Sequence, residues 1–168
     1  MAYTKQVEGR SYPYLYNVEM GVGQRKSLVK NGNSTTLYGY YQPNRRDDVM
    51  LVQYLLKRVY QRAQTANLNG ESARPSELKI DGIWGPKTQA AIEQYQLEMA
   101  RNGRSIATDG VVDSEKGSGT TSSISHTGYT ISWLNKYFWV LWPALAPNIT
   151  SDVECPYELK LALSRGKI

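Results

Sequence analysis

KIDGIWGPKTQAAIEQYQ, residues 79–96, joins a turn, a tryptophan and the start of a helix. Asp81-Gly82 favours a turn, because an Asp side chain can hydrogen-bond to the backbone just ahead and Gly adopts a positive φ without a steric cost. Gly85-Pro86 favours a helix start, since Pro lacks an N–H that the first helical position does not need. The stretch therefore predicts a tight turn that leads directly into a helix.

The helix after Pro86 has one apolar face. The residues that recur at helical spacing along it are Thr88, Ala91, Ile92, Tyr95 and Met99. Ile83 and Trp84 come just before the helix, so we expect them to fold over its first turn. A second Asp-Gly turn, TDGVVD at 108–113, follows the helix. Two turns of one kind are thus predicted on either side of a single helix.

An earlier helix is predicted at about residues 47–62. Asn44 is suited to cap it, and Asp47 and Asp48 lie in the first turn, where the helix dipole favours carboxylates. Its apolar face follows the i, i+3, i+4, i+7 spacing through Val52, Leu55, Leu56 and Val59. The polar stretch 65–77 then predicts a loop.

Two further helices are predicted in the second half of the chain. Residues 114–128 are rich in Gly, Ser and Thr, which predicts a flexible loop. Residues 130–142 form a predicted helix that is apolar on nearly every side and ends at Pro143. A helix of this length is too short to cross a bilayer, so we expect it to be buried. A short last helix is predicted at 156–165.

Residues 1–43 predict strands and loops. Tyr12, Tyr14 and Tyr16 alternate, so an extended strand would place their rings on one face. The segment 35–41 predicts a second strand. Tyrosine rings can stack on sugars and are also favoured at protein interfaces, and we interpret these three rings as an interface patch.

The positive charge is concentrated near the N-terminus. Residues 1–46 hold seven of the 20 Lys and Arg and two of the 15 Asp and Glu, which accounts for the whole net charge of +5. A basic segment can bind nucleic acid, an anionic wall polymer or an acidic protein, or it can simply be solvated. No recognition helix or RNA-binding signature accompanies it, so nucleic acid is not the favoured partner.

The inventory of reactive residues argues against an enzyme. Cys155 is the only Cys and His126 the only His, which is too few ligands for a metal site. Neighbouring acidic residues would oppose a thiolate at Cys155. Asp47 and Asp48 are the obvious carboxylate pair, and their place at a helix start explains both without a substrate. We therefore expect a protein without catalysis, cofactor or metal.

The length of 168 residues suits one domain with extensions. The N-terminus lacks the apolar stretch of a signal peptide, and no run reaches the roughly 18 apolar residues of a membrane span. We expect a protein made in the cytoplasm that something else delivers if it acts outside the membrane.

Three stretches together resemble the peptidoglycan-binding domain family of three-helix modules. RRDDVMLVQYLLKRVY (45–60) resembles the family's first helix, LKIDGIWGPKTQAAIEQYQ (78–96) its turn and second helix, and IATDGVVD (106–113) its second turn. The positions on the family pattern D-G-x-[FYW]-G-P-x-T-x-x-A-[IV]-x-x-[FY]-Q are Asp81, Gly82, Trp84, Gly85, Pro86, Thr88, Ala91, Ile92, Tyr95 and Gln96. The resemblance covers about residues 44–113, and 130–142 is a candidate for the third helix.

This resemblance implies a mainly α fold with three parts. Residues 44–142 would form a three-helix peptidoglycan-binding-like bundle that contains the inserted loop 114–128. Residues 1–43 would form a strand-containing N-terminal extension, and 143–168 a C-terminal extension with a short helix.

The resemblance also implies a ligand site beside the first turn. Trp84 would stack on peptidoglycan glycan or stem peptide, and polar contacts would come from Asp81, Lys87, Thr88 and Gln89. The alternative is an internal role for each of them, as caps or as part of the core.

Two functions follow as expectations. The first is a non-enzymatic peptidoglycan-binding module, carried in a phage or injection-machine particle. The alternative is a structural or assembly subunit of a phage virion or contractile tail that uses the fold only for protein–protein contacts. The interface would then include the three tyrosines together with Trp139 and Trp142 of the apolar helix, and the protein would form a homo- or hetero-oligomer.

Overall fold

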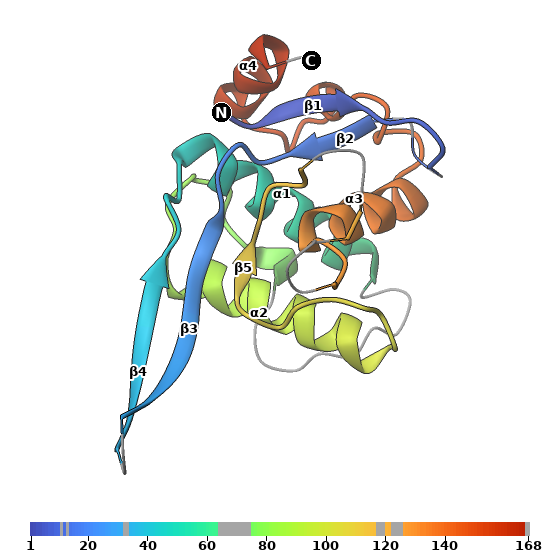
Figure 1. Ribbon diagram of the computed structural model, residues 1–168. Helices are drawn as coiled ribbons and strands as arrows, with labels where there is room; N and C mark the ends of the chain where they lie inside the picture. The colour runs from blue at the N-terminus through green and yellow to red at the C-terminus, as the bar shows by residue number, and fades with distance from the viewer. Residues whose placement is uncertain are drawn as a thin grey trace.

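The computed structural model describes residues 1–10, 12, 14–31, 34–63, 75–116, 120–121 and 126–166, with backbone only for 14, 25–31, 34–40 and 63. Within them, a mainly α body of four helices packs against short strands (Figure 1). The helices are α1 (Arg46–Ala63), α2 (Pro86–Arg101), α3 (Thr130–Leu141) and α4 (Tyr157–Arg165), with 3-10 turns η2 (Pro75–Glu77) and η3 (Ile149–Ser151). The four predicted helices are confirmed.

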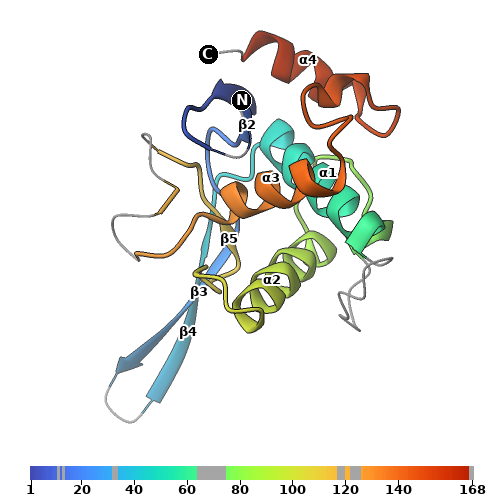
Figure 2. The same cartoon turned by 90° about the vertical axis from the view of Figure 1, so that its right-hand side faces the viewer.

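The strands form two small antiparallel sheets. The first pairs β1 (Tyr3–Gln6) with β2 (Tyr14–Asn17). The second has the order β4-β3-β5 and contains β3 (Val22–Asn31), β4 (Ser34–Tyr41) and β5 (Val111–Val112). The predicted strand at 35–41 corresponds to β4. Figures 1 and 2 show that the β3–β4 hairpin projects from the helical body.

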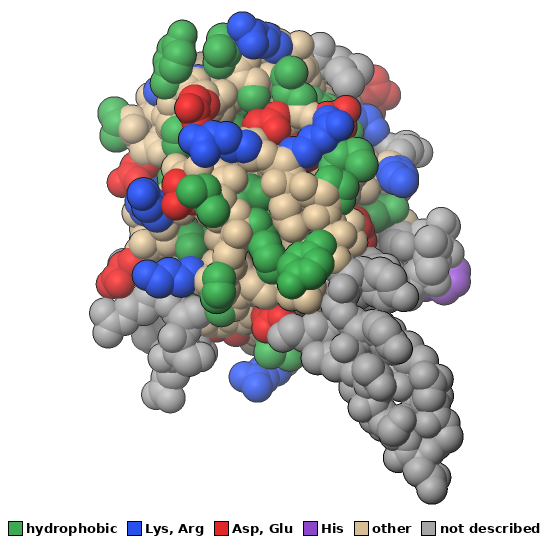
Figure 3. Space-filling model, turned by 90° about the vertical axis from the view of Figure 1, so that its left-hand side faces the viewer, with side chains coloured by type: hydrophobic (Ala, Val, Ile, Leu, Met, Phe, Trp, Pro, Cys, Tyr) green, Lys and Arg blue, Asp and Glu red, His purple; other side chains and the backbone are tan. Residues whose placement is uncertain are grey.

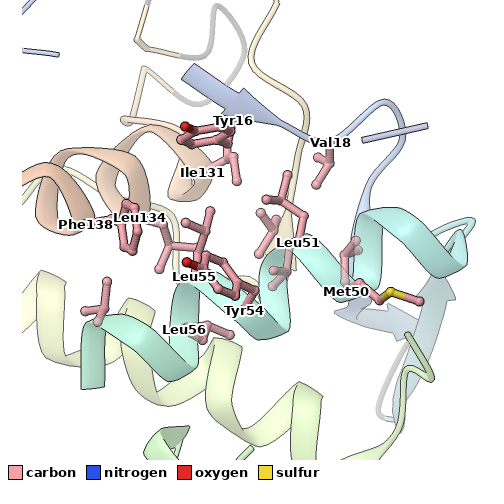
Figure 4. Packing of buried hydrophobic residues seen from close by; sticks show 14 of the residues in the cluster. Tyr16, Val18, Met50, Leu51, Tyr54, Leu55, Leu56, Ile131, Leu134 and Phe138 are labelled. Atoms are coloured by element: carbon pink, nitrogen blue, oxygen red, sulfur yellow. The ribbon is translucent and has the colours of Figure 1, made fainter. Parts of the chain in front are cut away.

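Helix α1 lies at the centre of the core. Figure 4 shows side chains of α1, α3 and β2 pointing toward one another, among them Tyr54, Leu134, Phe138 and Tyr16. The rings of Tyr54 and Phe138 lie 5.9 Å apart. Residues from both predicted extensions enter the same core: Ala2, Tyr16, Val18, Val22, Ala146, Ile149, Cys155, Leu159 and Leu163. The terminal segments are therefore packed as parts of one body.

Burial corrects the prediction for two of the tyrosines. Tyr12 and Tyr16 are each 3% exposed, so neither belongs to a surface patch. The Tyr16 hydroxyl donates to the Ala146 carbonyl at 2.7 Å and accepts from the Ile149 amide at 3.3 Å, which joins β2 to the C-terminal segment. The side chain of Tyr14 lies outside the described part of the structure.

The two tryptophans predicted at an interface are half-buried in the chain itself. Trp139 packs against the core. The Trp142 indole N–H donates to the Arg58 carbonyl at 2.7 Å, and the guanidinium groups of Arg58 and Arg62 lie 3.8 and 4.1 Å from its ring centre. On α3 the most exposed apolar side chain is instead Val140, at 70%.

The start of α1 differs from the prediction. Asn44 has a φ of 47°, and its side chain accepts from the Gly23 amide at 2.7 Å and donates to the Gln42 carbonyl at 2.9 Å. Asn44 thus fixes the base of the hairpin. Asp48 is fully buried and accepts from two backbone amides of the β2–β3 connection, each at 3.0 Å. Burial raises the pKa of Asp48 to about 6.

Two loop predictions fall partly outside the described residues. Of 65–77, only the end is described, as η2. Of 114–128, residues 117–119 and 122–125 lie outside. Glu115 in the described part is buried, pairs with the Arg10 guanidinium at 2.6 Å and accepts from the Ser132 hydroxyl. This end of the predicted flexible loop is therefore anchored in the body.

Candidate binding site at the Asp81–Gln89 turn

The turn at Asp81-Gly82 has the geometry that its sequence predicts. Gly82 has a φ of +69°, and a Cβ placed on it would lie 2.7 Å from the Arg46 carbonyl oxygen, so only Gly fits. The Asp81 carboxylate accepts from the Ile83 amide at 2.9 Å. Partial burial opposes ionisation, but this bond, a bond from Gln53 and the charge of Lys79 together lower the pKa of Asp81.

Gln53 of α1 clamps this turn from inside. Its side-chain oxygen accepts from the Asp81 amide at 3.1 Å and the Gly82 amide at 2.9 Å. Its amide nitrogen lies within hydrogen-bond distance of Asp81, the Ile83 carbonyl and the Thr88 hydroxyl, at 3.0 to 3.1 Å. Gln53 is 1% exposed. Gln53 was not among the predicted site residues, although a Gln inside the apolar stretch 51–56 indicates a buried polar partner.

The second turn is clamped in the same way by Gln96 of α2. The Gln96 side-chain oxygen accepts from the Gly110 amide at 2.8 Å, and its nitrogen donates to the Val111 carbonyl at 2.8 Å and the Thr130 hydroxyl at 3.0 Å. Gly110 has a φ of +76°, and Asp109 accepts from the Val111 amide at 3.1 Å. Each Asp-Gly turn is therefore fixed by a buried Gln of the preceding helix and a Thr of the following helix.

Gln89 links the two turns to the hairpin. Its side-chain oxygen accepts from the Gln24 amide at 3.0 Å and the Trp84 indole N–H at 3.2 Å. Its nitrogen donates to the Gly110 carbonyl at 3.1 Å and to Glu93 at 2.8 Å. Thr88 and Gln89 are only 3% and 7% exposed. Of the predicted polar contacts, Asp81, Thr88 and Gln89 thus use their side chains to brace the fold.

Other side chains at or beside this turn are exposed or half-buried. Ile83 is 64% exposed, Tyr41 is 66% exposed, Lys87 is exposed and Trp84 is half-buried. The Tyr41 and Trp84 rings meet edge to face with centres 5.4 Å apart. We call Tyr41, Ile83, Trp84 and Lys87 the turn face. Figure 3 shows one face of the molecule, on which exposed hydrophobic side chains lie among charged ones.

The turn face suits contact with a ligand that has an apolar surface and a negative charge. An aromatic pair offers flat area at a small loss of rotamer freedom, and the exposed Lys87 of the same turn adds one cation. The cavities described in the structure lie elsewhere, so this is an open surface rather than a pocket.

The described part of the chain also bears on metal binding, thiol reactivity and membrane insertion. There, no three His, Cys, Asp or Glu side chains lie close enough together to bind a metal ion. Cys155 is buried, and burial raises the pKa of its thiol to about 12, so the thiol stays protonated at neutral pH. None of the helices with described positions is long and apolar enough to span a membrane.

Comparisons of the chain with protein-family models, with curated proteins and with solved structures found no match.

Proposed function

We propose that this protein is a non-enzymatic module that binds bacterial peptidoglycan through the turn face, as a component of a phage or injection-machine particle. One observation carries the proposal. The residues that resemble the peptidoglycan-binding family's pattern are the ones that build the two clamped turns, from Asp81-Gly82 to Gln96. We infer that α1, α2 and α3 form a bundle of this family's kind.

The turn face has groups for both parts of the wall polymer. The rings of Tyr41 and Trp84 provide stacking area for the apolar face of a sugar. The exposed Lys87 provides a charge for a carboxylate of a stem peptide. The internal bonds of Asp81 and Gln89 hold this surface in one shape, which lowers the entropy that binding would cost.

Retention on purified sacculi tests this proposal. We expect the wild-type protein to be retained, and Tyr41→Ala and Lys87→Glu each to weaken retention by about threefold to tenfold, since each removes one contact. Trp84 is unsuitable for the test because it also packs against the core. Ile83→Ser has a matched control in Val153→Ser, because both change an exposed apolar residue to a polar one. A wild-type protein retained no better than an unrelated basic protein would refute the proposal.

The projecting hairpin favours a second candidate function, as an assembly subunit. β3 and β4 pair over the eight positions from Gln24–Tyr41 to Asn31–Ser34, whereas β5 pairs only with Val22 and Gly23. An isolated two-stranded ribbon is marginally stable in water and exposes backbone groups along its edges. A neighbouring subunit that covers the ribbon would remove both costs.

Light scattering over a range of concentrations tests the assembly function. We expect the full chain to associate, and a variant with residues 27–38 replaced by a two-residue Asn-Gly turn to remain monomeric with an unchanged helical signal. A full chain that stays monomeric at high concentration would contradict this function.

A further inference from the structure

We propose that the groove beneath α4 is a second binding site, for the glycan strand of the wall polymer. The groove lies between β1, the segment 147–150 and α4, and has a volume of about 830 Å³. Figures 1 and 2 show α4 lying over the β1–β2 sheet. This volume is within the range of pockets that bind small organic ligands. The inference rests on the proposed function and names the part of the polymer that this groove takes.

The chemistry of the groove matches a sugar chain. Tyr157 is 76% exposed and offers a flat ring at the groove. Apolar residues form part of the lining, namely Pro147, Leu161 and Leu163, and uncharged polar side chains lie among them, including Gln6, Asn148, Thr150 and Ser164. Hydroxyl and amide groups can both donate to and accept from sugar hydroxyls and N-acetyl groups. The combination of one open ring with several uncharged polar groups favours an N-acetylhexosamine oligosaccharide.

Lys160 adds a preference within this class. Among the described residues that line the groove, it is the only charged side chain. A single ammonium group among uncharged neighbours favours a ligand with an isolated carboxylate. The glycan strand of peptidoglycan has such a group wherever the lactyl ether of its sugar has no peptide attached.

The floor of the groove is already ordered. The Thr150 hydroxyl donates to the Asn148 side-chain oxygen at 2.6 Å, and the Ser151 hydroxyl donates to the Asn148 carbonyl at 2.8 Å. The Tyr16 hydroxyl bonds to the backbone on both sides of Asn148, at the Ala146 carbonyl and the Ile149 amide. The bonds described for the Asn148 side chain use its oxygen, so its NH₂ group is oriented and remains as a donor for a ligand. Pre-ordered donors bind with a smaller loss of entropy.

A sugar chain fits this groove better than an extended peptide does. A peptide would be expected to add to the free edge of β1. The Thr4 amide on that edge already donates to the Gly166 carbonyl, at 3.2 Å, at the end of α4. Strand addition would have to displace this contact, whereas a sugar bound by side chains would not.

One ion pair joins α4, which lines the groove, to the start of α1 beside the Asp81-Gly82 turn. The Arg46 side chain packs on Gly82, and its guanidinium donates to Glu158 at 2.8 and 3.2 Å. Glu158 directly follows Tyr157 in the chain.

Titration calorimetry with two soluble probes tests the groove. The first probe is peptide-free glycan strands prepared from sacculi with an amidase, and the second is chitotetraose, which has no carboxylate. We expect Tyr157→Ala to weaken binding of both probes by about tenfold. We expect Lys160→Gln to weaken binding of the glycan strands but not of chitotetraose. Val140→Ser on α3 is the control, because it changes an equally exposed residue away from the groove.

The outcomes separate this inference from the proposed function. One outcome is that neither probe binds and that Tyr157→Ala leaves sacculus binding unchanged. This outcome would overturn the groove site but would not contradict binding at the turn face. Probe binding that Tyr157→Ala removes, without sacculus binding by the wild type, would support the groove and overturn the proposed function. Binding of an extended peptide in the groove, with no affinity for either probe, would also overturn the inference.

Discussion

At the scale of single residues, Gly82 is the position where the turn depends most on one residue type. Its φ is +69°, and an added Cβ would lie 2.7 Å from the Arg46 carbonyl oxygen. We expect Gly82→Ala to lower the free energy of unfolding by about 3 kcal/mol or more, since backbone strain and a steric clash add. Urea denaturation measures this. Gly103→Ala is the matched control, because Gly103 has a φ of +76° with nothing within 4 Å of the added atom. Equal losses in the two variants would contradict a role for the clash.

The buried Gln53 gives a second prediction at this scale. Gln53→Leu keeps the side-chain volume but leaves the Gly82 amide and the Thr88 hydroxyl without their partner. We expect a loss of about 2–4 kcal/mol in the free energy of unfolding, because buried polar groups would be unpaired. Gln94→Leu on the half-buried side of α2 should cost less than about 1 kcal/mol. A Gln53→Leu variant as stable as wild type would show that water replaces the clamp.

The sequence predicts the residue types of the turn but not their partners. Asp81-Gly82 and Pro86 follow from local backbone rules, and these positions are as expected. Whether Thr88 and Gln89 face a ligand or the interior depends on Gln53 and Gly110, which lie at least 21 residues away. Local spacing carries no information on such contacts, so the sequence is compatible with a ligand-binding role and with an internal role for both residues.

At the scale of elements, Asp48 joins the start of α1 to the β2–β3 connection and makes this joint sensitive to pH. Its pKa is about 6 in the folded protein, raised by burial from its ordinary value near 4. The folded state therefore holds this proton more tightly between pH 4 and 6. The raised pKa of Asp48 adds to the free energy of unfolding at low pH. This contribution is lost as the pH rises through 6, and the loss amounts to up to about 3 kcal/mol.

Asp48→Asn isolates this effect. We expect the difference in unfolding free energy between wild type and variant to shift against the wild type as the pH rises from 4.5 to 7. Urea denaturation of both proteins at each pH measures the difference, in which the other carboxyl groups cancel. The nearby N-terminal amine, Asp47 and Arg45 are unchanged in the variant. A difference that is constant with pH would show that Asp48 titrates normally.

Helices were more predictable than strands. The starts predicted for the four helices, and the ends predicted for α1, α3 and α4, lie within one residue of those in the structure. An apolar face that repeats over several turns makes α1 and α2 easy to recognise. β1 and β5 have only four and two residues, which is too short for an alternating pattern to be recognised. Tyr12 continued the alternation of Tyr14 and Tyr16 in the sequence, yet β2 begins only at Tyr14.

At the scale of the whole molecule, one core unites segments that the sequence suggested were separate. Family resemblance marks out the part of the chain that follows a pattern, and residues outside it look like additions. The buried residues contradict this division of the chain, because nine of the 28 residues described in the main core cluster lie outside 44–142. Leu159 and Leu163 of α4 are 0% and 1% exposed. A terminal helix can be part of a core without any local signal that says so.

The fragment 44–142 tests this unity directly. It keeps all of α1, α2 and α3 but would expose the surfaces that Tyr16, Ile149 and Leu159 cover in the full chain. Loss of even one large buried side chain costs about 2–5 kcal/mol, and a domain is stable by only about 5–15 kcal/mol. We therefore expect the fragment to lack a cooperative urea transition. The full chain shortened only at hairpin residues 27–38 is the control, and should unfold cooperatively because every residue described in the main core cluster is kept. A fragment that unfolds as cooperatively as the full chain would show that the bundle is an independent domain, and that the terminal segments are additions to it after all.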